Sequence, residues 1–359
     1  MNARSGRIFR LIGAGRLVGA ATSIALSGAA MGCWNDPVGS LAVWSEFLPV
    51  AEVRDHLPTL ARYEADLYLA VRADDLDDEL AAFLTDARAA GVAVRPWLQL
   101  PDAGVWVNED NAEAFAAFAL AFLEWAATHG VLVEWLIFDL EPSFSYAEQL
   151  RTTSAEGGIG AALDLLTTHR DAERFEAARQ ALQELVDRLH TSGVRAMGVT
   201  LPWTIDDLAD GDPDLQDLFD TPLAGIDWDQ VSVMVYRPAF SDLLGVPLRP
   251  GYVARYAESM AQRFPGRAQV AIGNISTPGL LLPSGYTDPV EVALDVSAAR
   301  SAGVDNVSLY SLDGMVLAGG TEVWLAAAAA PTVTFSYPDP MAALVRWVFA
   351  GLDRSQDTP

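Results

Sequence analysis

Two carboxylates stand two residues apart where an apolar run ends. The run Val131–Pro142 reads VLVEWLIFDLEP, and Asp139 and Glu141 lie just before its closing proline. Side chains alternate along a strand, so both acids share one face with Trp135 and Ile137. Like charges held close together raise the pKa of one carboxyl group, which leaves a protonated acid able to donate at neutral pH. The pair therefore predicts acid–base chemistry, and a pair of surface acids in an acidic protein is the alternative.

Aromatic residues stand at or near the ends of other apolar runs. They are Trp44, Trp97, Trp203 and Tyr310. Aromatic faces stack on the apolar faces of sugar rings, so this set predicts a sugar site, although any single Trp could instead fill the core. Trp106, in the stretch 101–108, is a candidate for the lip of the site or a staple for its own loop. Trp125 and Trp347 fall in helical stretches and are expected in the core.

The elements that position these residues alternate between short β-rich runs and longer Ala-rich stretches. The expected strands are Leu41–Leu48, Asp66–Arg72, Val92–Leu100, Val133–Asp139, Val194–Leu201, Gln230–Tyr236, Ala268–Ile275 and Asn306–Ser311. The expected helices include Leu76–Ala90, Asn111–His129, Arg170–His190, Tyr252–Phe264 and Pro289–Ala302. This count predicts an α/β fold, a single-domain (β/α)₈ TIM barrel, because no G-x-G-x-x-G opens the first unit as a doubly wound dinucleotide fold would require.

Two long loops are expected at the end of the barrel that carries the chemistry. Ser143–Ala161 is rich in Gly and Ser and follows the fourth strand, and Pro202–Asp229 is acid-rich and follows the fifth. Active sites of TIM barrels lie at the carboxyl ends of the strands, which is where both loops begin. The barrel is expected over residues 41–330, followed at 331–359 by an extension with one helix, Met341–Leu352, and a polar tail.

The first residues read as an export signal. Met1–Arg10 holds three Arg and no acid, and a small, apolar stretch broken only by Arg16 runs from there to Gly32. Ala30-Met31-Gly32-Cys33 follows the order of a bacterial lipoprotein signal, with Cys33 as the acylated residue. We expect a signal at 1–32, a short linker at 33–40, and a lipid-anchored protein of the bacterial cell envelope. A plain cleaved signal and an uncleaved anchor are the alternatives.

Composition excludes several other functions. The 359 residues carry 48 acids against 23 bases, a net charge of −25, and every base is Arg. Such a chain repels phosphate backbones, so nucleic acid is a poor partner. Without Lys there is no Schiff-base chemistry, and one Cys with scattered His predicts no metal site. We expect no cofactor, and the sequence leaves the oligomeric state open.

The position of the acids favours one kind of glycoside hydrolysis. The expected seventh strand, Ala268–Ile275, holds no carboxylate, so a retaining mechanism that takes its nucleophile from that strand is incomplete. A lone D-x-E suits substrate-assisted hydrolysis instead. There the Glu protonates the leaving oxygen, the N-acetyl oxygen of the substrate attacks the sugar carbon, and the Asp orients the acetamido group.

Motifs on three expected strands resemble those of the family 18 glycoside hydrolases, the chitinases and endo-N-acetylglucosaminidases. Asp139-Leu140-Glu141 is similar to the end of their D-x-D-x-E motif, with Ile137 in place of the first Asp. Met234-Val235-Tyr236-Arg237 is similar to their M-x-Y-D, with Arg237 in place of the Asp, and Tyr310-Ser311-Leu312-Asp313 is similar to their aromatic residue before L-D. Their S-x-G-G is absent, and Arg95–Gln99 stands there.

The resemblance implies a role for each matching residue. Glu141 is the expected general acid, Asp139 its partner, and Tyr236 the contact to the acetamido group or transition state. The expected substrate-binding residues are Trp44, Trp97, Gln99, Trp203, Met234, Arg237, Tyr310 and Asp313. The expected partner is an oligo- or polysaccharide.

Three alternatives stay open at this point. The barrel could bind glycans without cleaving them, because of the Ile137 and Arg237 departures. It could also pair Glu141 with a loop carboxylate, and the candidates are Asp206, Asp207 and Asp313. Arg237 itself could bind an acidic sugar or pair with Asp139 or Glu141.

Overall fold

The computed structural model describes residues 39–101, 105–208, 211–276, 284–333 and 339–356. The expected export signal, Cys33 and most of the expected linker lie outside these ranges, as do residues 357–359. In the described part, no helix has both the length and the apolar character needed to cross a bilayer.

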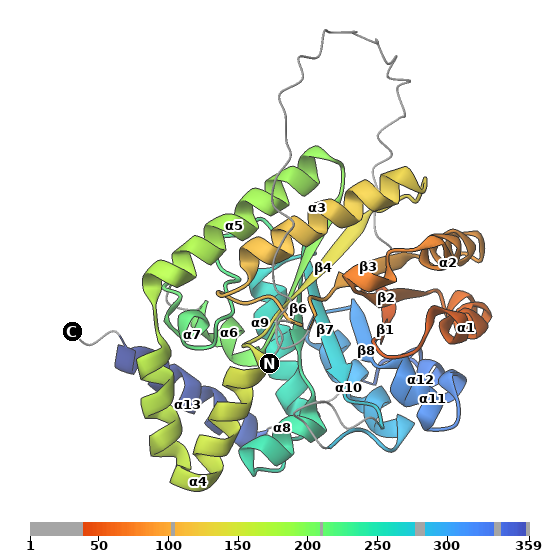
Figure 1. Cartoon of the computed structure of the whole chain (residues 1–359). Helices are drawn as coiled ribbons and strands as arrows, with labels where there is room; N and C mark the ends of the chain where they lie inside the picture. The colour runs from red at the N-terminus through yellow and green to blue at the C-terminus, as the bar shows by residue number, and fades with distance from the viewer. Residues whose placement is uncertain (1–38, 102–104, 209–210, 277–283, 334–338, 357–359) are drawn as a thin grey trace, which may run out of the picture. The chain divides into compact units, whose positions relative to one another are not determined.

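Eight parallel strands close into a barrel in which each strand pairs with the next along the chain and β8 pairs with β1 (Figure 1). The strands are β1 Leu41–Ser45, β2 Ala65–Val71, β3 Val94–Leu98, β4 Trp135–Leu140, β5 Arg195–Thr200, β6 Gln230–Met234, β7 Ala268–Gly273 and β8 Val307–Tyr310. Each lies within one residue of the run expected to contain it. The predicted TIM barrel is confirmed.

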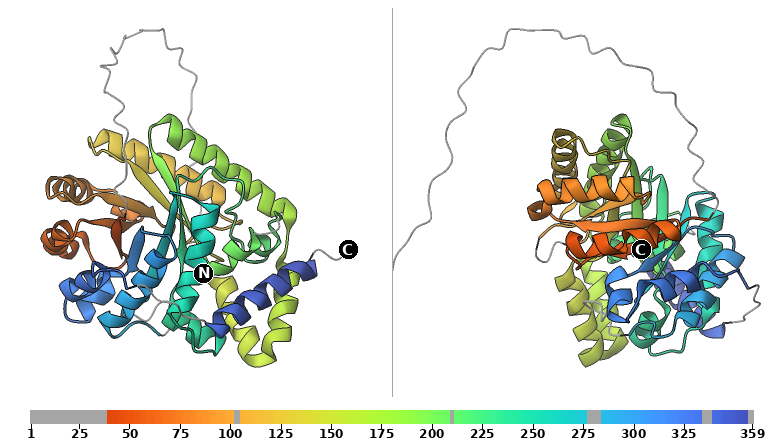
Figure 2. Two further views of the ribbon diagram at one scale, coloured as in Figure 1. Left: turned by 180° about the vertical axis from the view of Figure 1, so that it is seen from behind. Right: turned by 90° about the vertical axis from the view of Figure 1, so that its right-hand side faces the viewer.

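Helices surround these strands, as the views from behind and from the side show (Figure 2). Those that follow β1, β2, β3, β6 and β7 and complete their units are α1 Val50–Arg62, α2 Asp78–Ala89, α3 Ala112–Thr128, α9 Pro250–Arg263 and α10 Pro289–Ser301. Shorter helices are the 3₁₀ turn η1 Ala73–Asp75, α8 Arg237–Leu244, α11 Leu312–Leu317 and α12 Thr321–Ala328. Gly91 and Gly303 have φ of +81° and +96°, the left-handed conformation that ends α2 and α10.

The connection after β4 is largely helical, so its description as a loop was wrong, whereas the connection after β5 is the expected long loop with two short helices in it. After β4 the chain forms α4 Phe144–His169 and then α5 Ala172–Thr191, and after β5 it forms α6 Pro202–Asp207 and α7 Asp214–Leu218. Ser143 caps α4 by accepting the Tyr146 N–H at 3.3 Å. Gly158, at φ +76°, interrupts α4. The Gly and Ser residues that suggested a loop therefore mark a cap and a kink in a helix.

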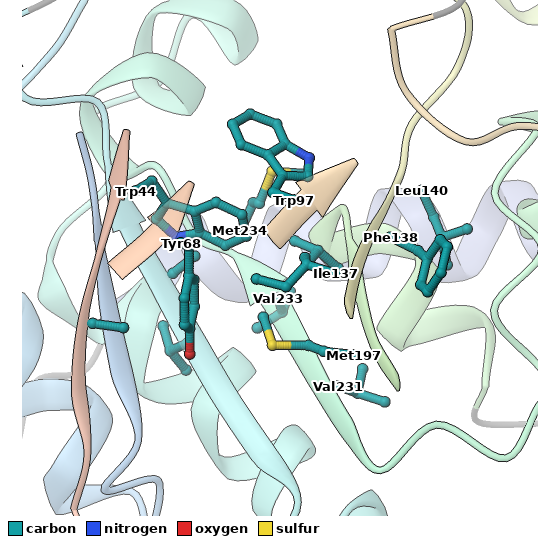
Figure 3. Packing of buried hydrophobic residues seen from close by; sticks show 14 of the residues in the cluster. Trp44, Tyr68, Trp97, Ile137, Phe138, Leu140, Met197, Val231, Val233 and Met234 are labelled. Atoms are coloured by element: carbon teal, nitrogen blue, oxygen red, sulfur yellow. The ribbon is translucent and has the colours of Figure 1, made fainter. Parts of the chain in front are cut away.

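The side chains of β4 alternate between its two faces as the sequence predicted. Ile137 lies beside Trp97 in the β3–β4 register, and Trp97 meets Trp44 edge-on with ring centroids 5.1 Å apart. Phe138 has the opposite parity and packs instead against Trp228 at 5.8 Å. Figure 3 shows Ile137 on the side of Trp97, with the Phe138 ring well apart from both. Asp139 and Glu141 therefore continue the inward row of β4.

The C-terminal extension belongs to the barrel's packing. Its helix, α13 Pro340–Gln356, contacts α6, α7 and α9. Phe349 of α13 stacks on Trp203 with ring centroids 5.2 Å apart. Trp347, expected in the core, is 67% exposed on the outer side of this helix, and that expectation was wrong.

Candidate active site

A cavity of about 690 Å³ lies at the carboxyl ends of the strands. Asp139, Glu141 and Tyr236 all line it, so the structure brings the three expected catalytic residues together. The expected substrate-binding residues that line the same cavity are Trp44, Trp97, Trp203, Met234 and Tyr310. Trp106 lines it too, as expected of a lip residue. The roles of all these residues remain predictions.

A third carboxyl group, Glu46, faces the same cavity and was missed at the sequence level. Glu46 directly follows β1 and is buried. Its carboxylate accepts a hydrogen bond from Gln99 Nε2 at 3.1 Å and another from the Tyr310 hydroxyl. The available signal was the position of Glu46, since a carboxylate at the end of a barrel strand is where TIM barrels place reactive groups.

The three acids perturb one another. Burial first, and the Glu46 charge second, raise the pKa of Glu141 to about 8. Burial, followed by the charges of Glu141 and Glu46, raises the pKa of Asp139 well above its usual range. Burial also raises the pKa of Glu46, but hydrogen bonds from Tyr310 and Gln99 and the charge of Arg72 oppose that rise. Of the three, Glu46 therefore has the surroundings that best hold a negative charge, and Glu141 is set to hold a proton at pH 7.

Tyr236 provides a neutral donor beside the acids. Its ring stacks on that of Tyr310 with centroids 5.7 Å apart. Burial, then the charges of Asp139, Glu141 and Glu46, raises the Tyr236 pKa well above its usual value. The phenol consequently keeps its proton, and its O–H can donate a hydrogen bond to a ligand.

One acceptor in the site is unused. Asp139 is 4% exposed, and its Oδ1 has no hydrogen-bond partner among the described residues. A buried carboxyl oxygen without a partner is costly, and such groups cluster where a ligand supplies the missing partner. Asp139 is therefore available to receive an N–H or O–H from a substrate.

Two expected substrate-binding residues support the site from outside the cavity. Gln99 is fully buried and holds Glu46. Asp313 accepts the backbone N–H groups of Glu46, Phe47 and Leu48 at 3.0, 2.8 and 2.7 Å, which fixes the turn after β1. In these positions Gln99 and Asp313 serve to place Glu46.

Arg237 has a different partner from either one expected. Its Nε donates to Asp295 of α10 at 2.7 Å, and Glu291 lies 3.7 Å from its guanidinium. Asp295 also accepts the Tyr286 hydroxyl. Pairing of Arg237 with Asp139 or Glu141 was therefore wrong, and the guanidinium is held away from the cavity lining.

The other loop acids are also engaged elsewhere. Asp206 accepts from the Tyr256 hydroxyl at 2.8 Å and from Arg346 Nε at 2.7 Å. Asp207 accepts the Leu215 N–H at 2.7 Å and Gln216 Nε2 at 2.6 Å. Neither lines the cavity, so Glu46 replaces the loop acids as the candidate second carboxylate.

One group of acids has the spacing of cation ligands. Oxygens of Asp207, Asp212 and Asp353 lie within 4.8 Å of one another, outside the cavity lining. Burial raises the pKa of Asp207 to about 6, and hydrogen bonds from Gln216, Leu215 and Asp353 oppose the rise. The hydrogen bond between Asp353 and Asp207 joins α13 to α6.

Comparisons with known proteins bear on the fold. No protein-family model matches the sequence, and a search of curated proteins finds no match. The PgaB (BpsB) glycoside hydrolase domain from Bordetella bronchiseptica is similar in structure, with 14% identity, a TM-score of 0.46, and coverage of 84% of this chain and 100% of that one. A GH18 chitinase from Pseudoalteromonas aurantia has 12% identity and a TM-score of 0.49, covering 81% of this chain and 98% of its own. A D-allulose 3-epimerase from Methylomonas sp. has 12% identity and a TM-score of 0.45, covering 82% and 96%. Likeness at this level extends to barrels of different activity and concerns the fold alone.

Proposed function

We propose that this protein is a glycoside hydrolase acting on N-acetylhexosamine-containing glycans, with Glu141 as general acid. The observation that carries the proposal is the Glu141 carboxyl group itself. It lines an aromatic cavity at the reactive end of a TIM barrel, and its pKa is raised to about 8. A general acid needs a proton at working pH and a place for the leaving group, and Glu141 has both.

The proposed bond changes use three residues that line the cavity together. Glu141 gives its proton to the glycosidic oxygen while the acetamido oxygen of the substrate bonds to the anomeric carbon, and the bond from that carbon to the leaving oxygen breaks. The unpaired Oδ1 of Asp139 accepts the acetamido N–H and so orients the acetamido group for attack. Tyr236 donates to the acetamido oxygen before it attacks. Water then bonds to the anomeric carbon, the bond from that carbon to the acetamido oxygen breaks, and Glu141, now ionised, accepts the proton of the water.

Glu46 supports a second mechanism. It is the one further carboxylate among the described residues that line the cavity, and its hydrogen bonds favour the ionised form. An ionised Glu46 opposite a protonated Glu141 has the division of labour of an ordinary two-carboxylate glycosidase. On that route the sugar needs no N-acetyl group.

The charge of the site selects against one substrate class. Glu46 is the carboxyl group of the cavity that best holds a negative charge, and Arg237 is held on Asp295, so uronic or sialic acids would meet repulsion and no free cation. Neutral sugars are the expected substrates.

Turnover of a chromogenic N-acetylglucosaminide oligomer tests the proposal. Glu141→Gln should lower kcat by about 10² to 10⁴ while binding persists, and Asp139→Asn should also slow turnover. A thiazoline mimic of the cyclised intermediate should inhibit the parent. Turnover that needs Glu141 and Glu46 but ignores the thiazoline would replace substrate assistance with the Glu46 route. Saturable glycan binding without turnover, unchanged by Glu141→Gln, would leave a glycan-binding barrel.

We also propose that the protein is exported and anchored through acylated Cys33. The basic and apolar segments before Cys33 support this proposal. A glycan-cleaving enzyme of the cell envelope would meet its substrates there.

A further inference from the structure

The cavity continues from the carboxyl groups into a part with different chemistry. We define this part, the apolar chamber, by Leu150 and Leu166 of α4, Leu243 and Leu244 of α8, and Val348 and Leu352 of α13. It shares one lining with Glu141 and Asp139, so a single ligand can reach both.

Polar groups are scarce in the apolar chamber. Among the described residues that α4, α8 and α13 contribute to the lining, only Arg151 and Ser154 carry polar side chains. The Arg151 guanidinium already donates to Glu148, with Nε 2.8 Å from the carboxylate. A sugar placed here would bury hydroxyl groups without partners, which would weaken its binding.

Two of the lining side chains leave apolar surface open to water. Leu243 is 48% exposed and Val348 is 51% exposed, although both face the cavity. Apolar surface beside a polar site marks a place where a ligand buries hydrocarbon.

From this step in polarity we infer that the substrate is a glycolipid, whose sugar lies at Glu141 and whose hydrocarbon aglycone occupies the apolar chamber. The inference rests on the proposed function for the position of the sugar. The substrate's chain would follow the cavity from the acids to α13, and Glu141 would protonate the oxygen that joins the sugar to the chain.

Binding of alkyl glycosides tests this inference. The ligands are β-N-acetylglucosaminides with methyl, butyl and octyl aglycones, titrated calorimetrically below their micelle concentrations into Glu141→Gln. Each fully buried methylene is worth about four-fold in affinity, so octyl should bind at least about 100-fold more tightly than methyl. Equal affinities along the series would overturn the inference, and so would equally tight binding of octanol, which carries no sugar.

Gly351 of α13 offers a way to fill the chamber. It lines the cavity, and a Cβ built there meets nothing within 4 Å. Gly351→Phe should remove most of the gain from methyl to octyl and leave methyl-glycoside binding unchanged. Gly160→Phe is the matched control, because Gly160 lies in α4, also has open space, and does not line the cavity.

A second pair of variants separates chamber polarity from folding. Val348→Asn should weaken octyl binding at least about 10-fold, since it places an amide against the chain. Leu344→Asn, one turn earlier on α13, is its control, because Leu344 is 46% exposed and outside the lining. Equal effects of the two variants would contradict the chamber's role.

Turnover distinguishes this inference from the proposed function. If the parent hydrolyses N-acetylglucosaminides equally well with methyl and octyl aglycones, the proposed function stands and the inferred glycolipid substrate is wrong. If the parent binds the octyl glycoside far more tightly than the methyl glycoside but cleaves neither, the hydrolase assignment is wrong and the glycolipid-binding site stands.

Discussion

Tyr310, the last residue of β8, donates a hydrogen bond to Glu46, the first residue after β1. The bond joins the ends of β1 and β8, the two strands whose pairing closes the barrel. The Tyr310 ring also stacks on the ring of Tyr236. Glu46, the cavity carboxylate that the sequence analysis missed, is therefore connected to Tyr310 and Tyr236, which the sequence analysis had placed in the site. Glu46 is thereby held as an acceptor beside Glu141.

Removal of the Glu46 charge should move the pH profile of the enzyme. Its negative charge contributes to the raised pKa of Glu141, which is about 8. Glu46→Gln should therefore lower the Glu141 pKa, and the alkaline limb of kcat/KM should shift to lower pH, because the general acid loses its proton earlier. Steady-state kinetics from pH 5 to 10 measure the shift. Glu113→Gln, an exposed acid on α3, is the control, and an unmoved or alkaline-shifted limb for Glu46→Gln would contradict the coupling.

Asp313 should prove to be a positioning residue. Its carboxylate accepts three backbone N–H groups from the turn that carries Glu46. Asp313→Asn should lower the free energy of unfolding by about 2–3 kcal/mol and reduce kcat with little change in KM. Denaturant unfolding and steady-state kinetics check this, with exposed Asp74→Asn as the control. A KM effect at unchanged stability would indicate direct sugar contact instead.

Arg237 should matter for stability through Asp295. The Asp295 side chain is fully buried and that of Arg237 is 11% exposed, so Arg237→Met leaves a buried carboxylate without its cation. The expected loss is about 3–5 kcal/mol of unfolding free energy. Adding Asp295→Asn should recover part of it, because the uncompensated charge is removed. If the two losses simply add in the double variant, the pair is not coupled.

Cys33 should determine where the protein is found. In a host that processes lipoproteins, the parent should partition into detergent, and Cys33→Ala should release or mislocalise it. Phase partition followed by immunoblotting measures this. Equal partition of parent and variant would refute acylation at Cys33.

The barrel was predictable because its signals are local. Alternating apolar runs and the capping glycines Gly91 and Gly303 lie next to the elements they define. The helix α4 was not predictable, since its cap and kink residues have the composition of a loop. The role of its apolar residues shows only in the folded chain, where they line one cavity together with residues of α8 and α13. D-x-E was visible within β4, whereas Glu46 became a site residue only when β8 closed on β1. Arg237 pairs with Asp295, which lies 58 positions further along the chain, and no sequence pattern links the two residues.

Leaving-group dependence tests most directly whether Glu141 is the general acid. The measurement compares kcat/KM of the parent and Glu141→Gln on an N-acetylglucosamine oligomer and on its dinitrophenyl glycoside. A dinitrophenolate leaves without a proton, whereas a sugar alkoxide needs one. The account predicts that Glu141→Gln loses about 10² to 10⁴ on the oligomer and little on the dinitrophenyl glycoside. An equal loss on both substrates, or no loss on the oligomer, would contradict it.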